Sequence, residues 1–226
     1  MKFIGLNHRF NFIGHSKTSF IIKLTHCKDI WLFNCCDGCQ QSIVKQGIKI
    51  NQISKIIITE LNIEIISGLL GLLSSLNLSS RNKPLHIYAP LGLSEYIDLG
   101  KKYCHTNFCY SIYVHILRRG LIIDHMNYRI YTMLKYHYFE FIIVAREKYG
   151  KFSLNKANNF NIITGPLYGK LKHGFSFILP DGVVLNGYDF TDINDIGIKF
   201  VLIINLYHFR PSIENSLYVN LMQYKL

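Results

Sequence analysis

Alanine is nearly missing from this sequence. Only three alanines occur in 226 residues, against 33 isoleucines, and the 14 Asp and Glu are outnumbered by 25 Lys and Arg, which gives a formal net charge of +11. Charged residues make up only 17% of the chain and hydrophobic residues 49%, a balance that excludes an intrinsically disordered protein. Because the frequent residues have AT-rich codons, the composition indicates an AT-rich genome, and the charge alone does not indicate nucleic-acid binding.

Long hydrophobic runs are lacking as well. The longest apolar stretch, residues 56–73, is interrupted by Glu60, Asn62 and Glu64, so we expect no membrane span and no membrane partner. The N-terminus has neither the apolar region nor the cleavage site of a secretory signal. We therefore expect a soluble protein that stays inside its compartment.

Six cysteines are present, and without a secretion signal we expect them to be reduced. Cys36-x-x-Cys39 is the one pair with metal or redox spacing. A second such pair, which a four-cysteine zinc site needs, is lacking, so a zinc or redox role is the lesser alternative.

Strand-like and helix-like segments alternate in the first third, which predicts an α/β layered core. Expected strands span 20–24, 30–33, 56–59, 85–88, 112–117, 128–134, 139–144 and 200–204, and expected helices span 40–46, 67–78 and 93–102. The segment 146–174 is polar and rich in lysine, which favours a long loop or protruding arm. Pro180-Asp181-Gly182 then predicts a hairpin turn between the apolar runs 175–179 and 183–185.

Five segments, in order, resemble the ribonuclease Z (tRNase Z) family of tRNA 3′-processing endoribonucleases. They are Trp31-Leu-Phe-Asn-Cys-Cys-Asp-Gly-Cys-Gln-Gln41, Ile57-Ile-Thr59, Gly68-Leu-Leu-Gly-Leu-Leu73, Leu85-His-Ile-Tyr-Ala-Pro-Leu-Gly92 and Gly165-Pro-Leu-Tyr-Gly-Lys-Leu-Lys-His-Gly174. The resemblance implies an α/β fold, the metallo-β-lactamase-type αββα sandwich, as a single domain over 1–226. It also implies truncation at the C-terminal end and an inserted arm at 146–174.

The resemblance places this family's zinc motif, H-x-H-x-D-H, on Glu60, Asn62, Glu64 and Ile65. Two zinc ions need several ligands at set geometry, and isoleucine cannot ligate, so the resemblance implies a lost zinc site, no cofactor and little or no nuclease activity. The alternative is an active tRNA 3′-processing endoribonuclease with a non-standard site. In it Glu60, Glu64 and His137, together with Asp37, would hold Mg²⁺ or Mn²⁺.

The arm carries the resemblance to the family's tRNA-binding exosite. Its matching residues are Gly165, Pro166, Lys170 and Lys172, and Lys148, Lys151 and Lys156 add charge. The resemblance therefore implies tRNA as a partner, since phosphate contacts need only charge and reach. A solvated basic loop in a protein with no RNA partner is the alternative.

The resemblance implies two further properties. The segment 68–73 contributes to dimer contacts in this family, so a homodimer is possible, although an apolar helix is more often plain core. The AT-rich composition and the family together favour a plastid-encoded protein of the chloroplast stroma. A cytoplasmic protein of an AT-rich bacterium is the alternative.

Overall fold

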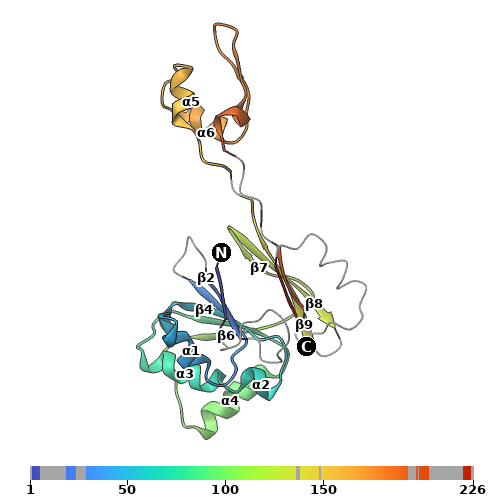
Figure 1. Cartoon of the computed structure of the whole chain (residues 1–226). Helices are drawn as coiled ribbons and strands as arrows, with labels where there is room; N and C mark the ends of the chain where they lie inside the picture. The colour runs from blue at the N-terminus through green and yellow to red at the C-terminus, as the bar shows by residue number, and fades with distance from the viewer. Residues whose placement is uncertain are drawn as a thin grey trace. The chain divides into compact units, whose positions relative to one another are not determined.

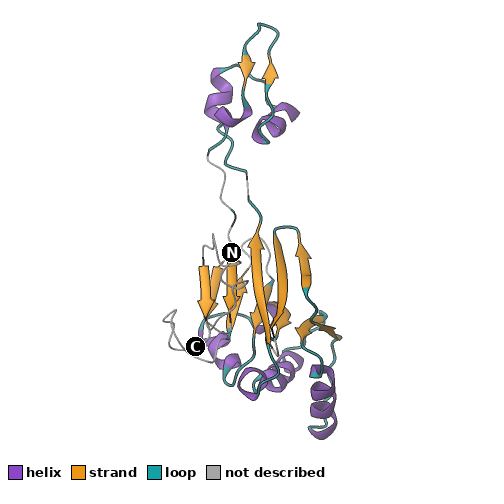
Figure 2. Cartoon of the chain, turned by 90° about the vertical axis from the view of Figure 1, so that its right-hand side faces the viewer, coloured by secondary structure: helices purple, strands orange, loops and turns teal. Residues whose placement is uncertain are grey.

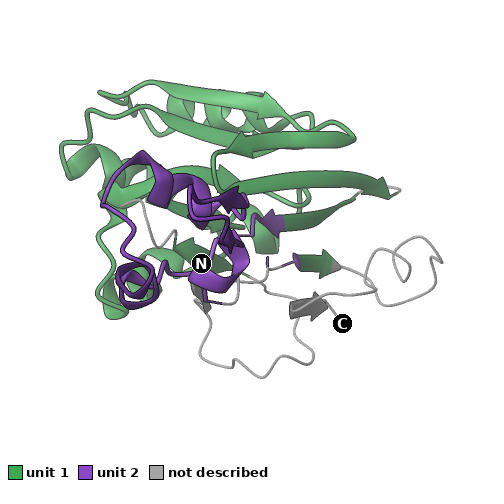
Figure 3. Cartoon of the chain, turned by 90° about the horizontal axis from the view of Figure 1, so that it is seen from above, with its two compact units in different colours: residues 1–143, 200–226 green, residues 144–199 purple. Residues whose placement is uncertain are grey.

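The computed structural model describes residues 2–5, 19–23, 29–135, 138–147, 149–192, 197, 199–203 and 221–224. The chain divides into two compact units, coloured separately in Figure 3. Unit 1 consists of residues 1–143 and 200–226, and unit 2 consists of residues 144–199.

The first sheet of unit 1 has the strand order β1-β2-β3-β4-β5-β6. Its strands are β1 (Lys2–Gly5), β2 (Phe20–Lys23), β3 (Ile30–Phe33), β4 (Ile53–Ile57), β5 (Leu85–Ala89) and β6 (Ile112–Ile116). Pairing is antiparallel from β1 to β3 and parallel from β3 to β6. The parallel part follows from the helices between its strands, because parallel neighbours need a crossover connection.

The second sheet of unit 1 has the order β13-β12-β9-β8-β7. Its strands are β7 (Gly120–His125), β8 (Tyr128–Lys135), β9 (Tyr138–Ala145), β12 (Lys199–Ile203) and β13 (Leu221–Tyr224). β7 and β8 form an antiparallel hairpin, whereas β12 and β13 are parallel.

Helices cover one face of the first sheet, and the second sheet packs on its other face (Figures 1 and 2). The helical layer consists of α1 (Cys39–Lys45), the 3₁₀ turn η1 (Ile50–Gln52), α2 (Ile63–Ile66), α3 (Leu69–Leu78) and α4 (Leu93–Tyr103). Alternate strand residues such as Leu85 and Ile87 join Leu72 and Leu76 of α3 in one buried cluster. The resulting helix–sheet–sheet layering agrees with the α/β core that the alternating segments predict.

Aromatic side chains fill the space between the two sheets. The Phe33 ring stacks on Phe20 with ring centroids 4.6 Å apart and meets Phe141 of the second sheet edge-on at 5.6 Å. Phe20 in turn meets Phe200 of β12 at 5.7 Å. These rings are fully or nearly fully buried and supply the large apolar area that joins the two sheets.

Unit 2 has a small core of its own. It contains α5 (Leu154–Asn159), α6 (Pro166–Lys172), the hairpin β10 (Phe177–Ile178) and β11 (Val184–Leu185), and the 3₁₀ turn η2 (Gly187–Phe190). Ala157, Leu171 and Phe190 are buried together in this core. A side chain at Gly187 would collide with the Leu171 carbonyl oxygen, so glycine is required where η2 crosses the end of α6.

Most of the expected strands and helices of unit 1 are confirmed, with some differences. The strand expected at 56–59 lies earlier, at β4, because Asn34 draws Thr59 out of the strand by a side-chain hydrogen bond. β1, β7, β13 and α2 were not predicted, nor were α5 and α6, whose polar composition resembles that of a loop. No helix in the described part of the chain has the length and apolar character needed to cross a membrane.

Replacing Phe33 tests whether the two sheets depend on this aromatic contact. Because Phe33 is fully buried between Phe20 and Phe141, Phe33→Ala should lower the free energy of unfolding by about 4 kcal/mol. Urea unfolding followed by circular dichroism measures the change. The control Leu78→Ala removes a side chain that is 85% exposed and should cost less than about 0.5 kcal/mol. Equal losses in the two variants would contradict the role of Phe33.

Candidate functional site

The candidate site lies where the parallel strands of the first sheet end. The segments after β3, β4, β5 and β6 span 34–38, 58–62, 90–92 and 117–119, and the carboxyl ends of parallel strands share one edge of a sheet. Backbone bonds continue the ladder past the strand ends, from Ile58 N–H to the Tyr88 oxygen and from Leu117 N–H to the Ala89 oxygen, both at 2.8 Å. The edge is therefore an ordered set of loops, and open α/β sheets bind ligands at such edges.

Asn34 joins the loop after β3 to the loop after β4. Its Oδ1 accepts hydrogen bonds from the Thr59 N–H at 3.0 Å and from the Thr59 hydroxyl at 3.1 Å, and both residues are buried. Asn34 has a φ of +56°, a left-handed conformation that asparagine tolerates better than most residues. From the other side, the Thr59 carbonyl accepts a bond from Phe139 N–H of β9 at 3.1 Å. Thr59 is thus fixed by both sheets.

The four residues at the expected zinc positions follow directly after Thr59, and the structure gives them separate roles. The Asn62 side chain caps α2 by accepting a hydrogen bond from Glu64 N–H at 3.2 Å. Ile65 is buried in the core under the first sheet, Glu64 is exposed, and Glu60 is partly buried. The side chains at these positions therefore do not converge on one point.

The residues present do not fit a zinc pair. Within the described ranges no group of three or more His, Cys, Asp or Glu side chains is placed to hold a metal ion. Asp37, a further candidate for a carboxylate site, lies in an exposed turn. His137, the remaining candidate ligand, lies outside the described residues. Of the candidates for a non-standard Mg²⁺ or Mn²⁺ site, the described residues are Asp37, Glu60 and Glu64.

Backbone contacts hold this loop in place. Cys35 N–H donates to the Ile65 carbonyl at 2.8 Å, and Gly68 N–H donates to the Cys35 carbonyl at 2.9 Å. A side chain at Gly68 would collide with the Cys36 carbonyl oxygen, which explains why the glycine of the expected G-L-x-G-L-L segment is present. The backbone contacts of this segment are therefore formed although glutamate, asparagine and isoleucine occupy the expected zinc positions.

The cysteine pairing in the structure differs from the spacing in the sequence. Cys35 Sγ and Cys39 Sγ lie 3.2 Å apart, whereas Cys36 Sγ accepts a hydrogen bond from the Ser19 hydroxyl at 2.9 Å. The hydrogen bond between the two sulfurs raises the pKa of the Cys35 thiol, as does its burial, and lowers the pKa of the Cys39 thiol. The contact pair is therefore C-x-x-x-C and not the C-x-x-C pair that the sequence singles out.

The residues expected to bind tRNA lie in unit 2. Gly165 and Pro166 begin α6, and they are exposed, as are the described lysines of this set, Lys151, Lys156, Lys170 and Lys172. Lys156 Nζ donates to the Asp189 carbonyl at 2.7 Å, so this side chain is partly engaged within the unit. Lys148 lies outside the described residues. The four exposed lysines leave charge available to a phosphate backbone.

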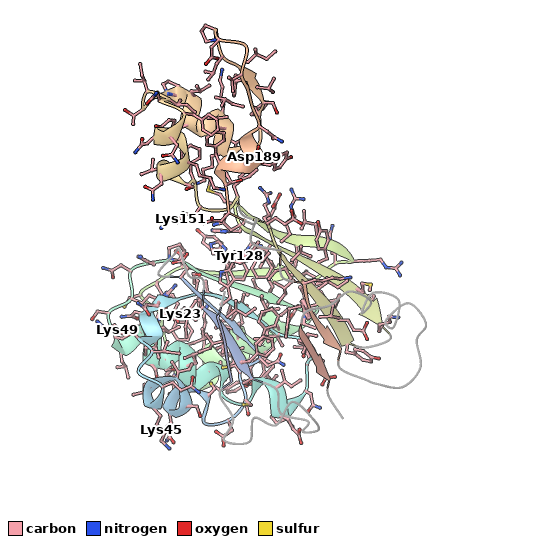
Figure 4. All side chains as sticks on the ribbon, turned by 45° about the horizontal axis from the view of Figure 1, so that its top comes forward. Lys23, Lys45, Lys49, Tyr128, Lys151 and Asp189 are labelled. Atoms are coloured by element: carbon pink, nitrogen blue, oxygen red, sulfur yellow. The ribbon has the colours of Figure 1, made fainter. Side chains whose placement is uncertain are left out.

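Charge is spread more widely than the lysines of 146–174 suggest. Of the 25 basic residues, seven fall in unit 2, and of the 14 acidic residues, five do, so unit 2 carries only +2 of the net +11. Exposed charged residues occur in both units. Figure 4 labels Lys23, Lys45 and Lys49 in unit 1, and Lys151 and Asp189 in unit 2.

Sequence reasoning missed Asn34 as the residue that anchors residues 59–68, the segment that holds the expected zinc positions and is called the motif loop below. A signal was available, because Asn34 stands where the resembling family segment W-L-F-D-C has aspartate. Both side chains offer an acceptor oxygen, which Asn34 uses for its two hydrogen bonds from Thr59.

Comparison with known proteins gives several relatives, and no family model matches. The chain is similar to the uncharacterized protein ycf56 of Pyropia yezoensis, with 39% identity over 87% of this chain and 75% of that protein. It is similar to ribonuclease Z of Acaryochloris marina, with 32% identity over 95% of this chain and 69% of that protein. For ribonuclease Z of a Nostoc species the identity is 34%, over 87% and 62% respectively.

Solved structures agree on the fold. Human tRNase Z, short form, matches with a TM-score of 0.50 and 24% identity over 57% of this chain and 58% of that chain. A long-form RNase Z from yeast matches with a TM-score of 0.54 and 15% identity over 98% of this chain and 32% of that chain. The expected α/β sandwich of the metallo-β-lactamase type is therefore confirmed.

The Asn34 contact can be tested by removing its acceptor oxygen. Asn34→Ala leaves two buried donors of Thr59 without an acceptor and places alanine at positive φ, so the free energy of unfolding should fall by about 3 kcal/mol. Asn34→Gly is the matched control, because glycine accepts this φ without steric strain while the hydrogen bonds are lost. Thermal and urea unfolding measure both variants. A glycine variant as stable as the native protein would show that the acceptor contributes nothing.

Proposed function

The chain belongs to the ribonuclease Z family, and we propose that it is a tRNA-binding member that has lost the family's zinc site. In this proposal the chain takes part in tRNA processing by binding tRNA and has little or no nuclease activity of its own. The proposal concerns this chain, which spans 69% of the Acaryochloris ribonuclease Z and 62% of the Nostoc protein.

One observation supports the loss of the zinc site, namely that residues at the expected zinc positions make structural contacts within the protein. Asn62 is occupied as the helix cap of α2, and Ile65 is packed in the core. Restoring a ligand at either position would remove a contact that stabilises the loop, so the present loop is adapted to doing without metal. Imidazoles on one loop are what the two-zinc chemistry needs, and this loop has none.

Unit 2 supports tRNA binding. It matches the family's G-P-L-x-x-x-L-K-x-G segment through Gly165, Pro166 and Lys172, with Lys170 at an unspecified position beside them, and its fold rests on its own core. Lys170 and Lys172 lie in the last turn of α6, where exposed lysine side chains can reach phosphates. Because this core contains no residue of the motif loop, tRNA binding does not require an intact zinc site.

The burial of the residues of α3 limits how the protein could form a homodimer. Leu69, Leu72 and Leu73 are fully buried within the chain, so a homodimer through 68–73 would have to use the partly exposed Leu70 and the exposed Gly71. The homodimer stays a prediction that light scattering on the purified protein tests.

The ycf56 relatives of Pyropia yezoensis and Porphyra purpurea support a plastid protein.

Metal content and cleavage separate the proposal from an active nuclease with a non-standard site. Purified protein incubated with Zn²⁺, Mn²⁺ or Mg²⁺ should retain no stoichiometric metal and should leave a 3′-extended tRNA precursor uncut, because the loop lacks converging ligands. Mass spectrometry of bound metal and gel analysis of the precursor are the measurements. Stoichiometric metal with trailer removal that is lost in Glu60→Ala, but kept in the exposed-residue control Glu95→Ala, would establish the active alternative instead.

Binding of tRNA is tested by the two lysines of α6. The double variant Lys170→Ala/Lys172→Ala should weaken tRNA binding and reduce the slope of log K against log salt by about 1 for each lost phosphate contact. Filter binding over a salt series gives both quantities. Lys45→Ala/Lys49→Ala removes the same charge from exposed positions of unit 1 and serves as the control. A protein without measurable, salt-sensitive tRNA affinity would be an interaction protein of another kind.

A further inference from the structure

Two buried thiols lie in contact beside the motif loop and have no part in the proposed function. Cys35 Sγ and Cys39 Sγ are 3.2 Å apart, and the residues are 0% and 1% exposed. The two sulfurs of a disulfide lie about 2.0 Å apart, so the Sγ atoms need to approach each other by only about 1 Å for the bond to form. The exposed turn of Asp37 and Gly38 lies between the two cysteines in the sequence, and its glycine has open space around it, so the turn can adjust.

From this geometry we propose that Cys35 and Cys39 form a reversible intrachain disulfide when the protein meets hydrogen peroxide. The thiolate of Cys39 attacks the peroxide, an S–O bond forms, the O–O bond breaks, and hydroxide leaves to give the sulfenic acid of Cys39. The thiolate of Cys35 then attacks that sulfur, the S–S bond forms, and the S–O bond breaks with loss of a second hydroxide. The two thiol protons convert both hydroxides to water, so two thiols and one peroxide give one disulfide and two waters.

The lower pKa of Cys39 agrees with its role as the attacking sulfur, because the thiolate is the reactive form. Peroxide is small enough to reach a thiol that lies just below a surface turn, whereas a bulky disulfide such as oxidised glutathione is not. We therefore expect hydrogen peroxide to form the bridge readily and oxidised glutathione to form it slowly.

The other described cysteines are placed differently. Cys36 Sγ is engaged by the Ser19 hydroxyl, and the Cys36 N–H donates to the same oxygen at 3.1 Å. Cys104 and Cys109 are exposed. The pairing is thus selective, and it differs from the C-x-x-C pairing of Cys36 with Cys39 that spacing alone would suggest.

A bridge at this position would act on the motif loop, because the backbone of Cys35 bonds to that loop at both its N–H and its carbonyl, to Ile65 and Gly68 respectively. Oxidation would fix the turn between β3 and α1 and would hold this edge of the site in one conformation. The bridge requires neither metal nor tRNA, so its failure would leave the proposed function untouched.

Thiol mapping of the native chain tests the proposal. Trypsin releases residues 29–45 as one peptide with three cysteines, Cys35, Cys36 and Cys39. After peroxide treatment of the folded protein and alkylation, this peptide should be lighter by two hydrogen atoms and should carry one alkyl group, and dithiothreitol should restore three. The peptide of residues 103–118 holds Cys104 and Cys109 and should stay alkylated at both.

Variants identify the pair. Cys36→Ser should keep the bridge, whereas Cys35→Ser and Cys39→Ser should each lose it. Three alkyl groups on the oxidised wild-type peptide would overturn the proposal even if a variant failed to fold. A bridge that persists in Cys35→Ser would also overturn it, because Cys36 would then be the partner of Cys39.

Discussion

The packing of β3 between two layers is the constraint on which the rest of unit 1 depends. Ile30 and Leu32 point into the core shared with the helices, and Trp31 and Phe33 point toward the second sheet, where they meet the rings of Tyr128 and Phe141. All four residues of the strand are at most 1% exposed. A strand buried on both faces has a fixed register, since a shift by one residue would exchange its faces. The loop after β3, which begins with Asn34 and Cys35, therefore starts from a fixed position, and the motif loop is held against it.

This dependence explains how the proposed loss of the zinc ligands is compatible with an ordered loop. In a protein whose loop is organised by its metal, the binding free energy of the ion is part of the folding free energy, and loss of ligands unfolds the loop. Here the fixed points are Thr59, bound by Asn34, and the Cys35 backbone, which bonds to Ile65 and Gly68. These contacts use backbone groups, one amide side chain and the Thr59 hydroxyl. Glutamate, asparagine and isoleucine at the expected zinc positions are therefore compatible with the fold, and Ile65 even adds a side chain to the core.

The sequence predicts the layered fold well because alternation of apolar runs is a local signal, and the family segments supply their order. The sequence does not predict features that depend on a single tertiary contact. Thr59 leaves the strand because of Asn34, 25 residues away, and no local pattern encodes that bond. The partner of Cys39 is Cys35 rather than Cys36 because Ser19, 17 residues before Cys36, engages the Cys36 thiol. α5 and α6 escape prediction because the core they share with Leu185 and Phe190 forms only after the chain returns through η2.

The net charge of +11 has a different meaning once it is divided between the units. The basic residues of unit 2 lie before residue 175, apart from Lys199, and all but one of its acidic residues lie after it, so the unit has a basic segment and an acidic segment that nearly cancel. Most of the excess charge belongs to unit 1 and not to the unit that carries the residues expected to bind tRNA. Non-specific affinity for RNA depends on the number of phosphates neutralised, whichever unit supplies the charges. Recognition of a particular RNA shape depends instead on where charges are held, and the lysines of α6 are held by a folded core. Overall basicity is therefore a poor guide to the proposed tRNA site, and the placement of Lys170 and Lys172 is the better one.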